Sequence, residues 1–270
     1  MVRDAVMNIL EQIVADKHKE VALKKSQVPV EAYTKMPLFE KDRRSLKASL
    51  QAEGSTGIIA EFKRRSPSKG SININADVAE VTAAYSQYAA GISVLTDEPY
   101  FGGTNDDLIL ARGTVNVPLL RKDFIVDEYQ LYEARSIGAD VILLIAACLS
   151  RQQVQQLARA AKSLQLEVLL EVHNAEELEH VCDEVDMVGV NNRNLKTFEV
   201  NIHTSLDLIT KMPKNKPAVA ESGISNVDTI VTLRHAGFKG FLIGENFMKH
   251  TSPSIAFADF INELKAKITT

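Results

Sequence analysis

Residues 57–63 read Gly-Ile-Ile-Ala-Glu-Phe-Lys, a short apolar run that ends in charged residues. Near-continuous apolar runs of this kind are typical of strands that are buried on both faces of a parallel sheet. Seven more such runs follow, and longer segments with helical spacing separate them. The eight expected strands are residues 57–63, 92–96, 118–122, 140–146, 167–172, 186–191, 217–221 and 240–244.

The segments between the strands carry apolar residues at helical spacing, as in Val154, Leu157, Ala158 and Ala161. Eight strand–helix units in about 210 residues match the size of a (β/α)8 barrel. A doubly wound open sheet is the structural alternative. Such sheets usually carry a glycine-rich nucleotide loop, and neither GxGxxG nor GxxxxGK(S/T) occurs here. We therefore predict an α/β protein with one domain over residues 1–270, a TIM barrel at 57–270 preceded by an N-terminal helical extension at 1–48.

The extension contains an apolar stripe at helical spacing, and residues 38–50 could supply another helix. One interpretation is a helix that covers the bottom of the barrel, and the other is a helix that reaches the substrate face. The sequence slightly favours the first. The stripe consists of Val6, Ile9, Leu10, Ile13, Val14 and Val21.

Composition excludes several classes of protein. The 270 residues are 45% hydrophobic and 24% charged, which is enough apolar material for a large core. The 31 Lys and Arg against 35 Asp and Glu give a net charge of −4, which argues against a nucleic-acid partner. Cys148, Cys182 and six scattered histidines form no metal or redox motif, so we expect no metal and no cofactor. With no membrane-length apolar run and no signal-peptide pattern, we expect a cytoplasmic protein without a membrane partner.

Polar side chains stand at the carboxyl ends of five expected strands. Because these ends form the active-site mouth of an α/β barrel, the side chains should share one pocket. Charged groups gathered in one cavity shift each other's pKa values, which separates acid and base roles. We expect the two ammonium groups to lower each other's pKa. The residues are Glu61, Lys63, Lys122, Glu171, Asn191 and Glu221, with Arg193 shortly after the sixth strand.

Two small-residue turns follow the last two strands, Ser222-Gly223 and Gly244-Glu245. Loops at these positions of a barrel often bind phosphate through backbone N–H groups. Lys63 and the segment 66–70 could close over the same anion, which would explain the basic run at residues 63–65 without nucleic acid.

Several segments, in this order, resemble the indole-3-glycerol phosphate synthase family, and the resemblance covers essentially the whole chain. They are Ile59-Ala60-Glu61-Phe62-Lys63-Arg64-Arg65-Ser66-Pro67-Ser68, Leu119-Leu120-Arg121-Lys122-Asp123-Phe124, Leu170-Glu171-Val172-His173, Gly189-Val190-Asn191-Asn192-Arg193-Asn194-Leu195 and Ala220-Glu221-Ser222-Gly223-Ile224.

The resemblance implies a carboxy-lyase of tryptophan biosynthesis that needs no cofactor or metal. Its substrate is 1-(2-carboxyphenylamino)-1-deoxyribulose 5-phosphate, a small sugar phosphate, and its product is indole-3-glycerol phosphate. By resemblance, Lys122 is the acid for ring closure and Lys63 holds the substrate's carboxylate. Glu171 is the acid/base glutamate of the dehydration step.

The resemblance also assigns supporting and binding residues. Glu61 and Glu221 match supporting carboxylates, and Asn191 and Arg193 match residues that position the substrate and a catalytic side chain. Glu245 departs from the commonest family pattern, and we expect it to offer its N–H while its side chain turns away. The phosphate-site positions are Ser66, Ser222, Gly223, Gly244 and Glu245, and the apolar contacts for the aromatic ring are Phe101, Phe124, Leu143 and Leu195.

Two alternatives remain at this stage. One is a relative of phosphoribosylanthranilate isomerase, which relies on a Cys/Asp pair, whereas Glu61 and Lys63 end the first strand here. The other is a non-catalytic barrel that binds a phosphate ligand. The sequence leaves the oligomeric state open, and a monomer is compatible with it.

Overall fold

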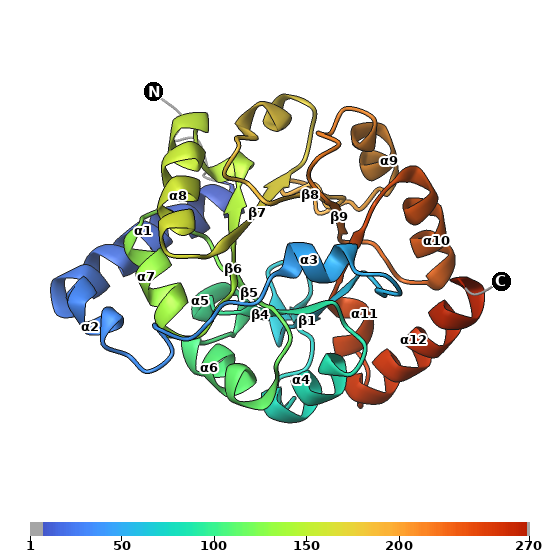
Figure 1. The fold of residues 1–270 in the computed structure, drawn as a ribbon, viewed down its shortest axis with the longest axis horizontal. Helices are drawn as coiled ribbons and strands as arrows, with labels where there is room; N and C mark the ends of the chain where they lie inside the picture. The colour runs from blue at the N-terminus through green and yellow to red at the C-terminus, as the bar shows by residue number, and fades with distance from the viewer. Residues whose placement is uncertain (1–7, 269–270) are drawn as a thin grey trace, which may run out of the picture.

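The computed structural model describes residues 8–268, and these form a closed barrel of parallel strands surrounded by helices (Figure 1). The strands pair in the order β1-β10-β9-β8-β7-β6-β5-β4, and β4 closes the barrel against β1. The predicted TIM barrel is therefore confirmed. The strands are β1 (Ile58–Phe62), β4 (Gly91–Leu95), β5 (Leu119–Lys122), β6 (Val141–Ile145), β7 (Glu167–Val172), β8 (Met187–Asn191), β9 (Ala218–Glu221) and β10 (Gly240–Ile243).

Helices cover the outside of the barrel, and polar caps mark where several of them begin. Asp77, Thr104, Ser150 and Asn226 each accept a hydrogen bond from a backbone N–H in the first turn of the following helix. The connection from β7 to β8 holds the 3-10 helix η2 (Glu176–His180). The helices are α4 (Val78–Ser86), α6 (Asn105–Thr114), α7 (Tyr129–Ser136), α8 (Arg151–Ser163), α9 (His203–Ile209), α10 (Val227–Ala236) and α12 (Pro253–Ile268).

Short elements occupy the loops at the carboxyl ends of the strands. The β1–α4 loop contains an antiparallel hairpin of β2 (Arg65–Ser66) and β3 (Gly70–Ser71). The other loop elements are α5 (Glu98–Phe101), η1 (Ala146–Cys148) and α11 (Glu245–Met248).

The strands alternate between two buried surfaces, because successive side chains point to opposite faces. In β1, Ile58 and Ala60 pack outward against the helices, whereas Ile59 lies in the barrel interior. Further along each strand, the same inward row reaches the carboxyl end of the barrel. The interior residues include Ile59, Leu120, Leu169, Met187, Val219 and Leu242.

The bottom of the barrel is covered by α3 (Leu46–Gln51). Leu46 and Leu50 are buried against the interior cluster, and Figure 1 shows α3 over the centre of the barrel. Gly91 at the start of β4 leaves room for this contact, since a Cβ there would lie 2.6 Å from Leu46 Cδ1. The predicted cover is thus supplied by α3. The expected boundary at residue 48 falls inside this helix.

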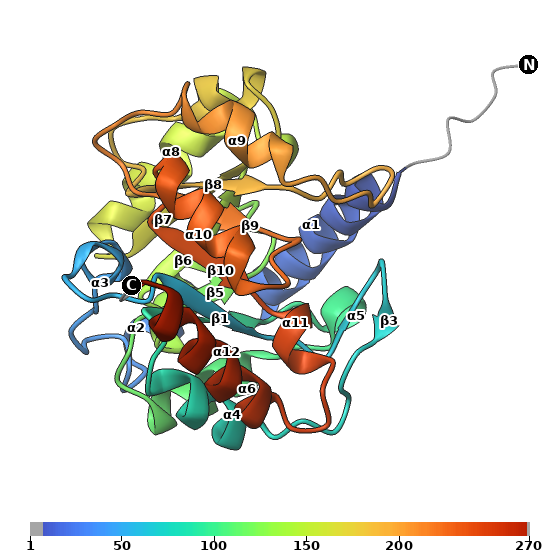
Figure 2. The same ribbon diagram turned by 90° about the vertical axis from the view of Figure 1, so that its right-hand side faces the viewer.

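The first helix, α1 (Ile9–Gln27), lies at the opposite end of the barrel from α3 (Figure 2). The favoured prediction, that this helix covers the bottom, is therefore wrong. The physical reason is Lys17, which is buried with its ammonium nitrogen 2.9 Å from Asp97 and 3.0 Å from Asp123. Asp97 follows the carboxyl end of β4 and Asp123 follows that of β5, so both lie at the end of the barrel opposite α3, here called the top. Val6, part of the predicted stripe, lies outside the described residues.

The chain continues from α1 through α2 (Val30–Thr34), which packs on α7, to reach α3 at the far end. The extension therefore runs along the outside of the barrel from top to bottom. Within residues 8–268, the helices are too short or too polar to span a bilayer.

We expect Lys17→Met to lower the free energy of unfolding by about 3 kcal/mol, because it leaves two buried carboxylates without their shared cation. Urea denaturation of the full chain measures this value. The matched control is Lys19→Met on the same helix, whose exposed ion pair with Asp16 should contribute far less to stability. Equal losses in both variants would show that Lys17 does not hold α1 in place.

Candidate active site

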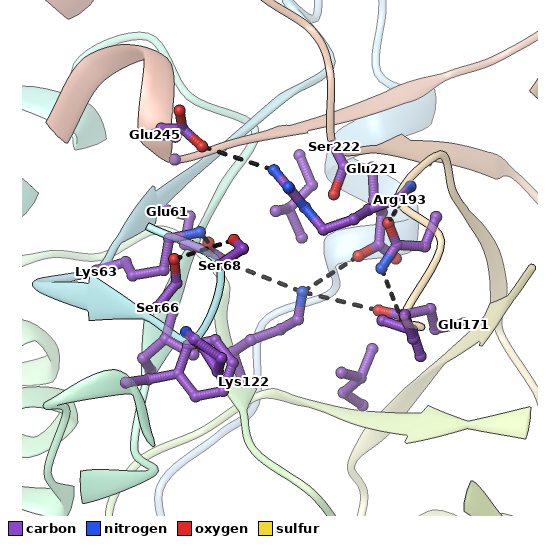
Figure 3. Close-up of a pocket in the computed structure, with 18 of the residues that line it drawn as sticks. Glu61, Lys63, Ser66, Ser68, Lys122, Glu171, Arg193, Glu221, Ser222 and Glu245 are labelled. Atoms are coloured by element: carbon purple, nitrogen blue, oxygen red, sulfur yellow. Dashed lines mark hydrogen bonds and ion pairs between the residues drawn. The ribbon is translucent and has the colours of Figure 1, made fainter. Parts of the chain in front are cut away.

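One pocket opens at the carboxyl end of the barrel (Figure 3). The inward rows of β1, β5, β7 and β9 carry apolar side chains deeper in the barrel and end here, two residues further along, in Glu61, Lys122, Glu171 and Glu221. Every site residue predicted from the sequence lines this pocket, although their individual roles stay predictions. They are Glu61, Lys63, Ser66, Phe101, Lys122, Phe124, Leu143, Glu171, Asn191, Arg193, Leu195, Glu221, Ser222, Gly223, Gly244 and Glu245.

Lys122 lies among three carboxylates from three different strands. Its ammonium nitrogen is 3.2 Å from Oε2 of Glu221, 3.7 Å from Oε2 of Glu61 and 3.9 Å from Oε2 of Glu171 (Figure 3). Lys63 pairs separately with Oε1 of Glu61, at 2.8 Å. The three carboxylates are almost fully buried, so these contacts lie in a medium that strengthens charge interactions.

The carboxylates dominate the titration of Lys122. Burial disfavours the charged ammonium, but Glu221, Glu61 and Glu171 outweigh this effect and raise the pKa of Lys122. For Lys122 this is the reverse of the lowering of its pKa that was expected from a neighbouring ammonium group. Each lysine is nearer to carboxylate than the sequence could reveal, and Lys122 is a cation at neutral pH.

The carboxyl groups of Glu171 and Glu221 have pKa values that move in opposite directions. Burial opposes ionisation of Glu171, but the nearby His173 and Lys122 lower its pKa. Burial raises the pKa of Glu221, and the neighbouring Glu171 charge adds to this, despite the opposing effect of Lys122. Glu171 is thus the ionised member and Glu221 the one that retains a proton most readily. Such a separation is typical of acid–base sites.

Asn191 fixes one oxygen of Glu171. Its Nδ2 donates to Oε1 of Glu171 at 3.1 Å, while its own Oδ1 accepts from the backbone N–H of Arg193 at 2.9 Å. The amide can therefore face only one way. It leaves Oε2 of Glu171 on the side of Lys122.

A second group of charges lies at the phosphate-site positions. Oε2 of Glu245 lies 3.6 Å from Nη2 of Arg193, and Oε1 lies 3.3 Å from Nζ of Lys69 in the β2–β3 turn. The expectation that the Glu245 side chain turns away is therefore wrong, because its carboxylate bridges these two cations. Ser66 and Ser68 line the same side of the pocket.

Apolar side chains from several loops and from α1 form an apolar slot in the pocket. The rings of Phe101 and Phe124 lie 6.1 Å apart at a tilt of 39°. Side chains of α1 complete the slot, which the favoured sequence interpretation missed because it placed this helix at the bottom. The apolar lining residues are Ile9, Leu10, Ile13, Leu95, Phe101, Phe124, Leu143, Ile145 and Leu195.

Two further residues shape the carboxylate cluster and were missed in the sequence. Ser93 of β4 donates to Oε2 of Glu61 at 3.1 Å. Gly189 of β8 is the inward residue next to Glu221, and a Cβ there would lie 2.2 Å from Oε1 of Glu221. The period-2 inward register was the available signal for both, but only the closed barrel shows which carboxylate each one faces.

Among residues 8–268 there is no group of three or more His, Cys, Asp or Glu side chains that could hold a metal ion. The pocket instead combines one apolar slot, one cationic mouth and a lysine–carboxylate centre. This combination can bind a ligand that carries an aromatic ring, an anionic group and a phosphate. The lysine and the carboxyl groups at the centre can exchange protons with such a ligand.

Comparison with known structures supports the fold. A chain from a structure of the tryptophan synthase α2β2 complex of Pyrococcus furiosus superposes with a TM-score of 0.59 at 14% identity, covering 78% of this chain and 97% of that one. At this identity, the likeness shows the barrel fold alone.

Comparison of sequences is more specific. A relative from Bacteroides thetaiotaomicron, named indole-3-glycerol phosphate synthase, is 46% identical over 259 residues, which are 96% of this chain and 99% of the relative. One of the same name from Verminephrobacter eiseniae is 42% identical and covers 93% of this chain and 98% of itself. The family model described as indole-3-glycerol phosphate synthase matches residues 10–260. The chain belongs to the indole-3-glycerol phosphate synthase family.

Proposed function

We propose that this protein is a carboxy-lyase that converts 1-(2-carboxyphenylamino)-1-deoxyribulose 5-phosphate to indole-3-glycerol phosphate, with loss of CO₂ and water, in tryptophan biosynthesis. The observation that supports this most directly is the position of Lys122. It lies among three carboxylates, in a pocket that also has an apolar slot and a cationic mouth.

The slot and the mouth of the pocket suit the two ends of the substrate. The aromatic ring fits the slot between Phe101 and Phe124, beneath the apolar face of α1. The phosphate fits the mouth formed by Arg193 and the turns at Ser222 and Gly244. In this orientation, the ketone carbon and the ring carbon that must bond to each other both lie near Lys122. Holding both reacting groups in one geometry accounts for much of the rate of such a reaction.

Ring closure needs a proton donor. As the ring carbon attacks the ketone, negative charge develops on the ketone oxygen, and Lys122 donates a proton to it. The raised pKa of Lys122 keeps this proton in place in the free enzyme. The developing alkoxide is far more basic than an amine, so transfer remains favourable. Lys63, near the same centre, balances the charge of the substrate's carboxylate until CO₂ leaves.

Dehydration needs a base and an acid. Glu171 is ionised, and its Oε2 faces the centre of the pocket, where it can take the proton that the ring CH₂ beside the nitrogen loses as the hydroxyl leaves, so that the indole nitrogen keeps its hydrogen. The leaving hydroxyl must be protonated. The acids available in the pocket are Lys122 and the protonated form of Glu221, whose Nζ and Oε2 atoms lie 3.2 Å apart. Glu61 contacts both lysines, Lys63 through Oε1 and Lys122 through Oε2.

The alternative functions have weaker support. A phosphoribosylanthranilate isomerase relative would need a cysteine in the pocket, whereas Cys148 lines a neighbouring cavity and burial raises its pKa to about 12. A non-catalytic binding barrel has no use for a lysine surrounded by buried carboxylates. The cytoplasmic location stays a prediction, argued from two cysteines that are free in the structure.

The direct test is incubation of the protein with the synthetic substrate while indole fluorescence is recorded. We expect product from the wild type, and we expect Glu171→Gln to lower kcat by roughly 10²- to 10⁴-fold with little change in KM, because it removes a general base and leaves the binding surfaces intact. Absence of product from the folded wild type contradicts the proposed function. Near wild-type turnover in Glu171→Gln would instead remove only Glu171 from the mechanism.

The two lysines should fail differently. Lys122→Arg keeps the charge but replaces the proton donor with a guanidinium that stays protonated, so we expect kcat to fall by roughly 10²-fold or more. Lys63→Arg keeps the charge that the substrate's carboxylate needs, and should mainly raise KM while turnover remains measurable. Steady-state kinetics of both variants decide the matter. Loss of turnover in Lys63→Arg with only weaker binding in Lys122→Arg would exchange their roles.

The carboxylate of Glu245 should compete with phosphate for Arg193 and Lys69. We therefore expect Glu245→Gln to tighten inhibition by inorganic phosphate about fivefold, the effect of roughly 1 kcal/mol from one partly exposed charge. Glu199→Gln removes an exposed charge near the same loops and serves as the control. If phosphate inhibits Glu245→Gln no better than wild type, the carboxylate does not compete for the site.

A further inference from the structure

Two ionisable side chains behind Glu171 have no part in the mechanism above. His173 follows β7 directly, and Glu177 lies in η2. Nε2 of His173 is 3.3 Å from Oε1 of Glu171, and Nδ1 is 3.2 Å from Oε2 of Glu177. The imidazole is therefore placed between two carboxylates, with only 13% of its side chain exposed.

Glu177 is itself held rigidly. Its Oε2 accepts from the backbone N–H of His173 at 2.8 Å, and its Oε1 accepts from Nδ2 of Asn174 at 2.9 Å. The backbone N–H of Glu177 donates in return to Oδ1 of Asn174 at 2.9 Å. The carboxylate that faces Nδ1 of His173 thus has a fixed position, and it in turn limits rotation of the imidazole ring.

The contacts to Glu171 are asymmetric. Both His173 and Asn191 approach Oε1, at 3.3 and 3.1 Å, whereas Oε2 faces Lys122 at 3.9 Å. Asn191 donates a hydrogen bond to Oε1, and the imidazole makes an ion-pair contact with the same oxygen without hydrogen-bond geometry, so the other oxygen is left for the substrate. Glu171 lines the pocket, whereas His173 lines a second, neighbouring cavity. The imidazole can therefore act on the reaction only through Glu171.

We propose that His173, held by Glu177, is a positioning residue that fixes Oε1 of Glu171 with a protonated imidazole and so leaves Oε2 as the ionised oxygen that accepts the substrate's proton. This inference rests on the proposed function of the site. It assigns Oε2 of Glu171 as the atom that accepts the proton, and it adds His173 and Glu177 as two residues that act through Glu171.

The charges around the imidazole are consistent with a cation at this position. Burial disfavours protonation, but Glu171 and Glu177 outweigh it and raise the pKa of His173 to about 10. On the pocket side, Lys122 and Glu221 face Glu171. The other ionisable groups that line the cavity with His173 are Glu11 and His18 of α1, Cys148 of η1, and Arg193, Lys196 and Glu199 after β8.

The first experiment compares pH profiles of kcat/KM. His173→Gln removes the cation beside Glu171, so the pKa of that carboxyl rises and a higher pH is needed to ionise it. We expect the acidic limb to move to higher pH by about one unit or more. At neutral pH we expect kcat to fall about tenfold, which is the size of effect seen when a residue that orients a metal ligand is removed from an enzyme. KM should change less than about twofold, because His173 lies outside the pocket.

Glu177→Gln should move the same limb in the same direction by a smaller amount, since it weakens the imidazolium without removing it. The matched control is Glu176→Gln, an exposed residue of the same 3-10 helix with the same change in charge. An acidic limb that stays in place in both His173→Gln and Glu177→Gln, with only stability reduced, would overturn the proposal.

A second measurement does not depend on activity. In protein labelled with ¹⁵N at histidine, the imidazole signal that responds to Glu177→Gln and not to Glu176→Gln belongs to His173. We expect that ring to carry protons on both nitrogens at pH 8, and a neutral ring at pH 7 would contradict the proposal even if His173→Gln does not fold. Because product formation by the wild type is measured separately, failure here leaves the proposed function standing.

Discussion

The ion cluster around Lys122 is the interaction on which the site depends. Glu61, Glu171 and Glu221 come from β1, β7 and β9, and without a nearby cation carboxyl groups this deeply buried could not ionise. Lys122 contacts all three carboxyl groups, and Glu61 and Glu171 each have a second cationic partner, Lys63 and His173. These unequal contacts give neighbouring carboxyl groups different proton affinities, as acid–base catalysis requires. Small inward residues make this cluster possible, since Gly189 provides the space that the Glu221 carboxylate fills.

The N-terminal extension acts at both ends of the barrel. Near its end, α3 seals the floor with Leu46 and Leu50, which join the apolar interior. At its start, α1 forms part of the wall of the apolar slot and is anchored there by Lys17. Asp123, one of the two anchoring carboxylates, is the residue after Lys122. Docking of α1 and placement of the proton donor are therefore coupled through adjacent residues of one strand end.

Under the proposed function, the cations assigned to the substrate's anionic groups already have carboxylate partners in the substrate-free protein. Lys63 pairs with Glu61, while Arg193 and Lys69 share Glu245. Substrate binding then exchanges one anion for another instead of bringing isolated cations into contact. Such pairing keeps long side chains ordered before binding, which lowers the entropy cost of the complex. For Glu245 the exchange also carries a repulsive cost, since its carboxylate must leave the phosphate site.

The sequence alone determined the order of strands and helices and the charged centre of the pocket, because both follow from local periodicity, whereas the apolar and phosphate-site positions came from the family resemblance. Apolar strand runs alternate with helical segments, and a period of two puts Glu61, Glu171 and Glu221 on inward rows at strand ends, where the barrel brings them together. Only the tertiary structure decided what depends on contacts between distant segments. The apolar stripe of α1 fits either end of a barrel, and the burial of Lys17 against Asp97 and Asp123 selects the top. The raised pKa of Lys122, the bridging position of Glu245 and the placement of His173 against Glu171 likewise depend on distances of a few ångströms between separate loops. Those distances are set by barrel closure and packing, which residue spacing along one chain segment does not encode.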